Sequence, residues 1–253
     1  MGLRAHIAAV ESISFETVRE MFDLLDACYH NVTREQFQRD LFEKDWVIII
    51  KDSTSLSLKG FSTLKVFLHD FQGKTCRVAF SGDTIIAPSC WGSLRLPMAF
   101  GALMLSILNE RPDLPLYWML ITKGIRTYRV LPVFFKEFYP RYDNDTPVQM
   151  CQLMHALGYR KYPRKYTDSG IIKAPETGQY LRRELSGENS VQDRLDHHVR
   201  YFLNKNPGHV NGDELLCLAE FSLDNLCPYI IRQLQKAEKL EIVRNSKTFS
   251  KTI

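Results

Sequence analysis

An apolar segment at residues 96–109 lies between two runs that have the composition of buried strands. The run before it, 75–88, is rich in β-branched residues, and the run after it, 114–122, is almost wholly apolar. A strand, a loop, an apolar helix and a second strand form a crossover unit, in which the two strands lie parallel and close together. The sequence therefore predicts a parallel strand pair, joined by a buried helix, at residues 75–122.

The chain before this unit predicts an antiparallel region. Residues 46–50 form a continuous apolar run, typical of a strand buried on both faces, and residues 58–71 alternate between apolar and polar side chains. Short turns join these runs to 75–88, so three consecutive antiparallel strands are expected. Ser14 and Thr33 are predicted N-caps of two helices that follow a first strand at 7–13. The fold class is therefore α/β, with a mixed, mostly antiparallel central sheet flanked by helices.

The chain after residue 122 predicts further helices and one hairpin. Apolar spacing predicts helices at 126–138 and 148–157, the second closing at Gly158, and residues 159–175 have the pattern of a last hairpin. Beyond residue 177 the pattern becomes helical and polar. We therefore predict one domain at 1–175, followed by a helical C-terminal extension at 176–253 with a frayed tail.

The composition excludes several classes of protein. Hydrophobic residues make up 45% of the chain and charged residues 25%, a balance typical of a globular chain rather than a disordered one. The net charge of +4 is too small to predict a nucleic-acid partner. The six cysteines include no C-x-x-C pair, and the first residues lack the apolar core of a signal peptide. The richest apolar stretch, 94–108, is too short and too interrupted to cross a bilayer, so we expect a reduced, cytoplasmic protein without a transmembrane segment.

The order of the predicted elements resembles that of the GNAT superfamily of CoA-dependent N-acyltransferases over residues 7–174. The strand end Ile85-Ile86-Ala87-Pro88 fits the Val-x-Pro-like strand end of that family. The resemblance implies that the central strand separates from its parallel neighbour and that a thioester donor lies in the gap. The donor's pyrophosphate would then rest on the loop and the helix N-terminus, where unpaired N–H groups attract anions.

The loop after this strand departs from the family's pattern, which is Arg/Gln-x-x-Gly-x-Gly/Ala. Trp91, Leu94 and Leu96 stand where the pattern has Arg or Gln, the first Gly and the small residue, and Gly92 supplies one flexible position. This bulk favours a donor of another shape, such as an acyl chain on a carrier protein, as the alternative to acyl-CoA. The large apolar residues indicate a long acyl chain, although plain core would have the same composition. The residues expected to contact the donor are Ile85, Ile86, Ala87, Trp91, Gly92, Ser93, Leu94 and Arg95.

Asp83 is the candidate base, because it lies where the resemblance places the separation of the two strands. A carboxylate there can take a proton from an amine, whereas the alternative reading is that residues 81–83 only form a bulge. The family's usual acid, a Tyr four residues before a Gly-Phe pair, corresponds to Met154 here. Tyr128 and Tyr139 are the candidate substitutes, and each also fits a tyrosine at the edge of a core.

Three further groups of residues have weaker patterns. Lys123 and Arg126 follow the strand at 114–122, where they fit either an anion site or ordinary loop charges. Residues 159–166 alternate aromatics with cations, which fits a basic strand face better than a nucleic-acid site. The neighbouring histidines at 197–198 would point about 100° apart on a helix, so no metal site is predicted.

The function that the resemblance implies is transfer of an acyl group from a thioester donor, acyl-CoA or an acyl-carrier protein, to an amine. Two alternatives stay open at this point. The departures at the loop and at Met154 fit a catalytically inactive binding or regulatory module. A protein that binds acyl-CoA or acyl-carrier protein without turnover fits as well. Under each reading the extension could support a homodimer.

Overall fold

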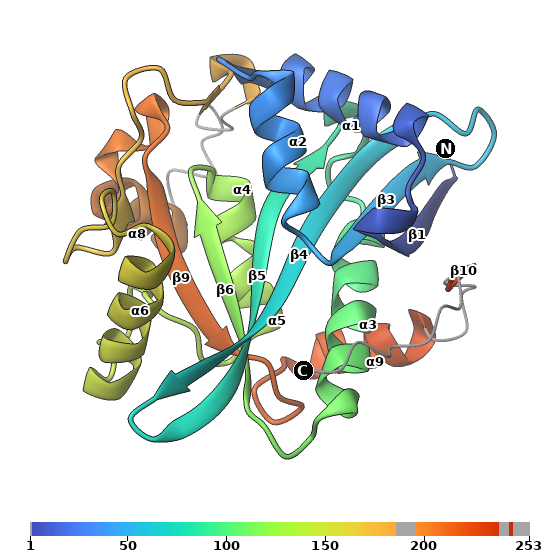
Figure 1. Cartoon of the computed structure of the whole chain (residues 1–253). Helices are drawn as coiled ribbons and strands as arrows, with labels where there is room; N and C mark the ends of the chain where they lie inside the picture. The colour runs from blue at the N-terminus through green and yellow to red at the C-terminus, as the bar shows by residue number, and fades with distance from the viewer. Residues whose placement is uncertain (1, 186–195, 238–242, 245–253) are drawn as a thin grey trace.

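The computed structural model describes residues 2–185, 196–237 and 243–244. Within these residues, eight strands form the central sheet shown in Figure 1. In sheet order they are β10 (Val243–Arg244), β1 (Leu3–Ala9), β3 (Trp46–Asp52), β4 (Leu58–Phe71), β5 (Lys74–Ile86), β6 (Leu116–Thr122), β9 (Glu214–Glu220) and β7 (Ile171–Ile172). The pairs β5–β6 and β1–β10 are parallel, and the other neighbours are antiparallel. The predicted mixed, mostly antiparallel sheet is confirmed.

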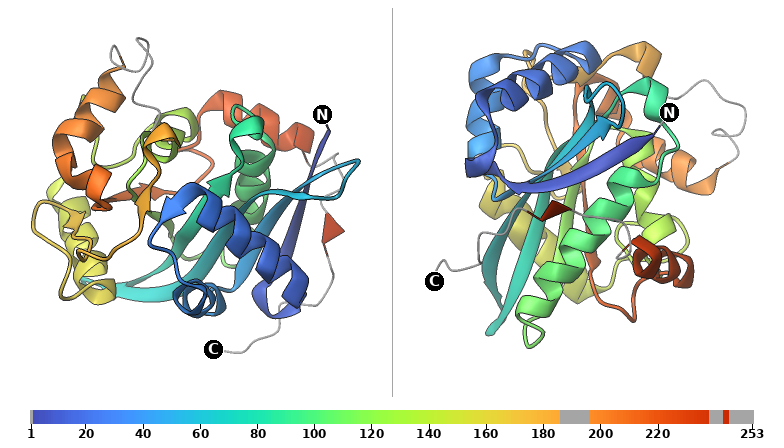
Figure 2. Two further views of the ribbon diagram at one scale, coloured as in Figure 1. Left: turned by 90° about the horizontal axis from the view of Figure 1, so that it is seen from above. Right: turned by 90° about the vertical axis from the view of Figure 1, so that its right-hand side faces the viewer.

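Helices cover both faces of the sheet, as Figures 1 and 2 show. They are α1 (Phe15–Cys28), α2 (Arg34–Phe42), α3 (Arg95–Glu110), α4 (Ile125–Tyr128), α5 (Val130–Phe134), α6 (Val148–Lys161), α8 (His197–Lys205) and α9 (Pro228–Ala237). A separate short pair joins β2 (Tyr29–His30) to β8 (Tyr180–Leu181). None of the helices in the described part of the chain has the length and apolar character that a bilayer crossing requires.

The helix caps and the crossover unit agree with the sequence analysis. Ser14 Oγ accepts a hydrogen bond from the Thr17 N–H (3.2 Å), and Thr33 Oγ1 accepts one from the Gln36 N–H (3.2 Å). These bonds satisfy N–H groups that the first turns of α1 and α2 leave without helical partners. Helix α3 connects β5 to the parallel strand β6, as predicted.

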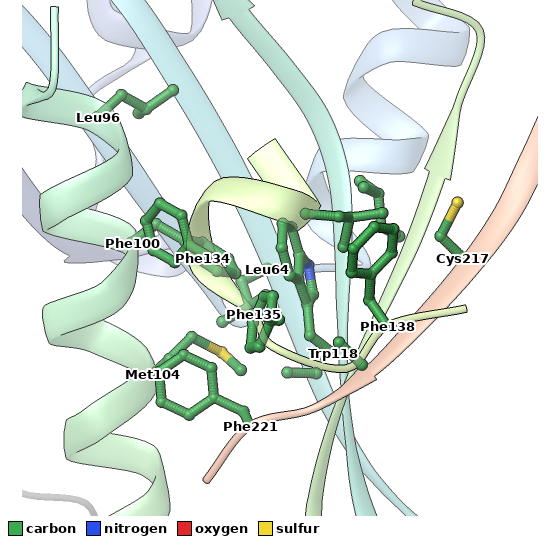
Figure 3. Packing of buried hydrophobic residues seen from close by; sticks show 14 of the residues in the cluster. Leu64, Leu96, Phe100, Met104, Trp118, Phe134, Phe135, Phe138, Cys217 and Phe221 are labelled. Atoms are coloured by element: carbon green, nitrogen blue, oxygen red, sulfur yellow. The ribbon is translucent and has the colours of Figure 1, made fainter. Parts of the chain in front are cut away.

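The core has two main layers, one on each face of the sheet. On β3, Ile48 and Ile50 belong to the cluster beneath α3, whereas Val47 and Ile49 belong to the cluster beneath α1 and α2. The continuous apolar run is therefore a strand buried on both faces, as expected. Figure 3 shows the aromatic centre of the α3 layer, where the Trp118 ring lies between Phe100 and Phe135 with centroid distances of 4.7 and 5.7 Å.

The elements predicted between residues 126 and 175 have other bounds in the structure. Pro132 has no N–H and fits only the first turn of a helix, so the expected helix at 126–138 is split into α4 and α5. The helix predicted at 148–157 is confirmed as α6, but it continues through Gly158 to Lys161, and the missing side chain of Gly158 leaves room for the Tyr166 ring. The predicted hairpin at 159–175 is reduced to the antiparallel bridge between Tyr166 and Ile172, because residues 159–161 belong to α6.

The largest correction concerns the chain beyond residue 176. Strand β9 lies inside the central sheet, between β6 and β7, and pairs with β6 from Tyr117–Glu220 to Thr122–Leu215. The segment expected to be a helical extension thus supplies a fully buried strand, together with α8 and α9. Its apolar run at 215–218 has the pattern of such a strand, but its sheet partner lies about a hundred residues earlier in the chain. The predicted frayed tail lies mostly outside the described residues.

Candidate active site

The parallel strands β5 and β6 separate part-way along their length. Their pairing runs from Arg77–Leu116 to Ser81–Leu120 and stops there, although β5 continues to Ile86. Beyond this point β5 pairs only with β4, and β6 pairs only with β9. Two strand edges therefore face each other across a gap, and unpaired edges of this kind can bind an extended ligand through backbone hydrogen bonds.

A bulge in β5 marks the point of separation. Ser62 pairs with Thr84 and Leu64 with Ser81, so that Gly82 and Asp83 together stand opposite a single residue of β4. Such a bulge bends the strand and increases its twist, which turns β5 away from β6. The Trp118 Nε1–H donates to Ser81 Oγ (3.0 Å) and ties the last paired position to the core beneath. The interruption seen in the sequence is thus a bulge.

The absent side chain of Gly82 leaves room for its neighbours at this bulge. A Cβ on Gly82 would lie 2.6 Å from Thr63 Oγ1 and 2.7 Å from Lys44 Cε. Both distances are well below van der Waals contact, so a larger residue would displace the Lys44 side chain. The missing side chain lets Lys44, which follows α2, reach across the strand to the position next to Asp83.

A cleft of about 360 Å³ opens at the gap. Its walls come from the end of α1, from α2, from the diverging ends of β5 and β6, from the end of α6 and from the start of β9. Its charged residues are the acids Asp40, Glu43, Asp83 and Glu214 and the lysines Lys44, Lys123, Lys161 and Lys165. These side chains come from separate segments of the chain, which the sheet and the helices packed on it bring together.

Asp83 lies half-buried in this cleft. Burial raises the pKa of its carboxyl above the usual range, and the ammonium groups of Lys123 and Lys44 oppose that shift. Lys123 is itself paired, since its Nζ lies 3.5 Å from Glu214 Oε1 and donates to the Gln179 carbonyl (3.2 Å). Asp83 is therefore a carboxylate with increased basicity, held between two cations.

Two tyrosines that the sequence analysis did not single out also line the cleft. Tyr29 lies at the end of α1, and Tyr162 follows α6. Burial raises the pKa of both hydroxyls, and the negative charges of Asp83 and Glu214 raise it further. Both hydroxyls therefore stay protonated at neutral pH and can donate hydrogen bonds into the cleft. Tyr162 belongs to the segment 159–166, in which aromatics alternate with cations. The sequence analysis interpreted that segment as a basic strand face and did not predict that it lines a cleft.

The two tyrosines predicted as acids lie outside the cleft. Tyr128 is fully buried in the α3 layer, where its hydroxyl donates to the Pro140 carbonyl (3.0 Å). Tyr139 packs in the cluster beneath α6, and its hydroxyl donates to Glu137 Oε2 (3.2 Å). Tyr128 is thus a core residue, and Tyr139 lies at the edge of the core.

The predicted donor loop lies at the end of β5, beyond the residues that line the cleft. Trp91 donates its Nε1–H to the Ile86 carbonyl (3.1 Å), and the guanidinium of Arg126 stacks on the Trp91 ring at 3.8 Å from its centroid. Arg126 comes from α4, which follows β6. The stack therefore links the loop that follows β5 to the helix that follows β6. Gly92, which the sequence analysis gave as the flexible position of the loop, has φ +82°, a backbone conformation that favours glycine.

The N-terminus of α3 offers fewer donors than an ordinary helix start. Ser93 Oγ accepts the Arg95 N–H (3.2 Å), and Pro97, in the first turn, has no N–H to offer. Leu94 at the N-cap gives no side-chain hydrogen bond. An anion at this end would consequently depend on cationic side chains such as Arg126 as well as on the backbone.

No family model matches the chain, and no curated protein matches it. Among solved structures, a conserved protein from Enterococcus faecalis described as a "Probable N-Acyltransferase" matches 55% of this chain and 33% of its own, with 19% identity and a TM-score of 0.41. Saccharomyces cerevisiae N-myristoyltransferase with bound myristoyl-CoA matches 48% of this chain and 29% of its own, with 17% identity and a TM-score of 0.36.

A GNAT family N-acetyltransferase from Escherichia coli in complex with CoA matches 53% of this chain and 70% of its own, with 13% identity and a TM-score of 0.33. The matched part of this chain spans a third or less of the length of the first two proteins.

Proposed function

We propose that this protein transfers an acyl group from a thioester donor to an amine. The observation that carries the proposal is the separation of β5 from β6 at Ser81, directly beside a half-buried carboxylate at Asp83. The gap offers strand edges to an extended donor, and the cleft beside it offers a base to an acceptor. The similarity to N-acyltransferase structures is consistent with this assignment.

The donor is proposed to lie along the segment from Thr84 to Ala87, on the edge of β5 that β6 leaves unpaired, where the Ile86 carbonyl already accepts a hydrogen bond from Trp91 Nε1–H. Its anionic end would extend toward the loop at 91–95 and toward Arg126, which is exposed and already in contact with that loop. The thioester carbonyl would then lie near the bulge, at the junction of the gap and the cleft. Acyl-CoA is the simplest donor of this kind, and an acyl-carrier protein would present the same thioester.

Asp83 is proposed as the general base. An amine enters the cleft as an ammonium ion, and the carboxylate of Asp83 takes one of its protons, which frees the nitrogen lone pair to attack the thioester carbonyl carbon. A C–N bond forms, the C–S bond breaks, and the second proton lost by the nitrogen passes to the thiolate. The raised pKa of Asp83 brings its basicity closer to that of the amine than an exposed carboxylate would be.

Tyr29 and Tyr162 are proposed to replace Tyr128 and Tyr139 in the mechanism. Because their hydroxyls stay protonated, they can donate hydrogen bonds to the oxyanion of the tetrahedral intermediate or to the departing thiolate. Loss of one such donor commonly lowers turnover about 10²–10³-fold. Either Tyr→Phe variant should therefore lower kcat more than it changes donor affinity.

The test is thiol release from acyl-CoAs of increasing chain length in the presence of an amine panel. Asp83→Asn should lower kcat about 10²–10⁴-fold while the Kd for the donor stays within about twofold. Asp113→Asn is the matched control, because Asp113 is an exposed carboxylate in the turn before β6. Thiol release by Asp83→Asn at the wild-type rate would remove Asp83 from the mechanism. Donor binding with no thiol release by any amine would point to a binding protein without turnover.

A further inference from the structure

Two lysines of the cleft share one aromatic ring. The ammonium of Lys161, the last residue of α6, lies 4.3 Å from the centroid of the Phe80 ring, and that of Lys44 lies 5.7 Å from it. Phe80 is buried and precedes the bulge of β5. The ring attracts both cations, so two ammonium groups from distant segments lie within 5.7 Å of its centroid in the cleft.

Neither ammonium is neutralised by a direct partner. Within the described part of the chain, neither Lys44 nor Lys161 has a carboxylate oxygen at ion-pair distance, and Lys44 Nζ instead donates to the backbone carbonyl of Asp40 (2.6 Å). The Asp40 carboxylate accepts from Gln36 (2.8 Å). Burial and the charge of Lys44 lower the pKa of Lys161, against a smaller opposing effect of Glu43 and Asp40.

Two partly buried like charges beside each other are unfavourable until an anion joins them. A carboxylate placed between them would gain two charge-assisted hydrogen bonds in a site partly shielded from water. Lys123, the other lysine that faces Asp83, does not offer a second carboxylate such hydrogen bonds, because its Nζ already lies 3.5 Å from Glu214 Oε1. The Lys44–Lys161 pair is therefore the anion-binding end of the cleft.

The position of this pair relative to Asp83 limits the ligand. A Cβ on Gly82 would lie 3.4 Å from Lys44 Nζ, so this cation lies close to the residue directly before the proposed base. An acceptor that reaches both groups must carry its amine and its acid group only a few bonds apart. An α-amino acid, whose ammonium and carboxylate share one carbon, has this spacing.

Resting on the proposed function, we infer that the acceptor is an α-amino acid. Its carboxylate lies between the ammonium groups of Lys44 and Lys161, and its ammonium faces Asp83, where it loses the proton before acyl transfer. Glu214, another acid of the cleft wall, stays with Lys123. This assignment accounts for two cations and one base that are otherwise unfavourably placed.

The experiment compares each of the twenty L-amino acids with its own amide, which keeps the amine and the side chain but loses the carboxylate. Equilibrium binding to the full chain is measured by titration calorimetry, and thiol release from acyl-CoAs is measured separately. At least one amino acid should bind ten times or more tightly than its amide. Lys161→Met should abolish that preference, whereas Lys161→Arg should restore most of it.

Lys74→Met is the matched control, since Lys74 is an exposed lysine at the start of β5. Equal binding of amino acids and amides, or no binding of any amino acid, overturns the inference. Thiol release with other amines would keep the proposed function in that case. Conversely, an amino acid that binds through the lysine pair without any thiol release overturns the proposed function and keeps the binding site. A melting-temperature measurement on each variant shows that lost binding is not lost folding.

Discussion

Arg77 is expected to be one of the most sensitive single positions of the scaffold that holds the cleft. It lies on β5 and is only 5% exposed, yet it carries a charge into the core. Its guanidinium donates to the carbonyls of Ile107, Leu108 (3.3 Å), Arg111 (2.6 Å) and Leu114 (3.0 Å). These are the carbonyls that the end of α3 and the following turn leave without helical partners. Arg77 therefore joins the end of α3 to the strand that forms the gap.

The cost of removing this group follows from the number and kind of bonds. A hydrogen bond to a charged group contributes about 1.5–3 kcal/mol, but four bonds from one guanidinium are not additive. The substitution also removes the cost of burying the charge, and Arg77 Nε is buried without a partner. Arg77→Met should therefore lower the free energy of unfolding by about 3–5 kcal/mol, because each buried carbonyl left without its donor costs about 1–3 kcal/mol and the removal of the buried charge offsets part of that sum. For a chain of this size the melting temperature should fall by about 6–20 °C.

Urea unfolding of Arg77→Met, followed by circular dichroism, measures this loss. Arg77→Lys keeps the charge but reaches fewer carbonyls, so its loss should be smaller. Arg111→Met is the control, because the Arg111 side chain is exposed and pairs only with Asp113 at the surface, where such pairs contribute about 0–1 kcal/mol. A loss below about 1 kcal/mol for Arg77→Met would refute the reasoning, because water would then satisfy the carbonyls as well as the guanidinium does.

Three further predictions concern the cleft and its entrance. Because burial raises the pKa of Asp83, the folded protein holds this proton more tightly than the unfolded chain, so stability should fall as pH rises from about 3.9 through the raised value. Asp83→Asn should remove this slope and raise stability at pH 7, and an unchanged urea midpoint across the pH range would contradict it. Gly82→Ala places a Cβ against Thr63 and Lys44 and should cost about 1–3 kcal/mol by urea unfolding, so a neutral effect would show that the bulge tolerates a side chain. Arg126→Ala should raise the Kd for acyl-CoA about fivefold or more by calorimetry, which is about 1 kcal/mol, and unchanged affinity would leave Arg126 as a surface stack only.

The parts of the fold that were predictable depend on signals that lie close together in the sequence. Ser14 and Thr33 cap helices through residues three positions away, and the apolar segment between two strand-like runs specifies its own crossover. Strand β9 depends instead on pairing with β6, about a hundred residues earlier, so its run at 215–218 could not be placed. Gly158 was taken as a helix end, whereas its conformation is set by the Tyr166 ring that packs on it.

The residues of the candidate site also differ in whether a signal close by in the sequence predicts them. Asp83 was predicted because the resemblance places the separation of the two strands there, and the bulge of β5 lies at this residue. The ends of three helices, α1, α2 and α6, bring Tyr29, Lys44, Lys161 and Tyr162 to the bulge, and no local pattern assigned them a role at a site. Apolar packing determines the position of Tyr128, and no pattern of spacing distinguishes such a tyrosine from one at a site.

The most direct test of the central claim is hydrogen–deuterium exchange of the full chain with and without saturating acyl-CoA. A donor in the gap should slow exchange of the backbone amides at 84–87 and 91–95, and a hundredfold excess over Kd should stabilise the protein by about 2.7 kcal/mol. Stabilisation with protection confined to these segments and the facing end of β6 is the predicted result. Unchanged exchange and unchanged stability with every acyl-CoA from acetyl to palmitoyl would contradict the assignment of the gap as the site for an acyl-CoA donor.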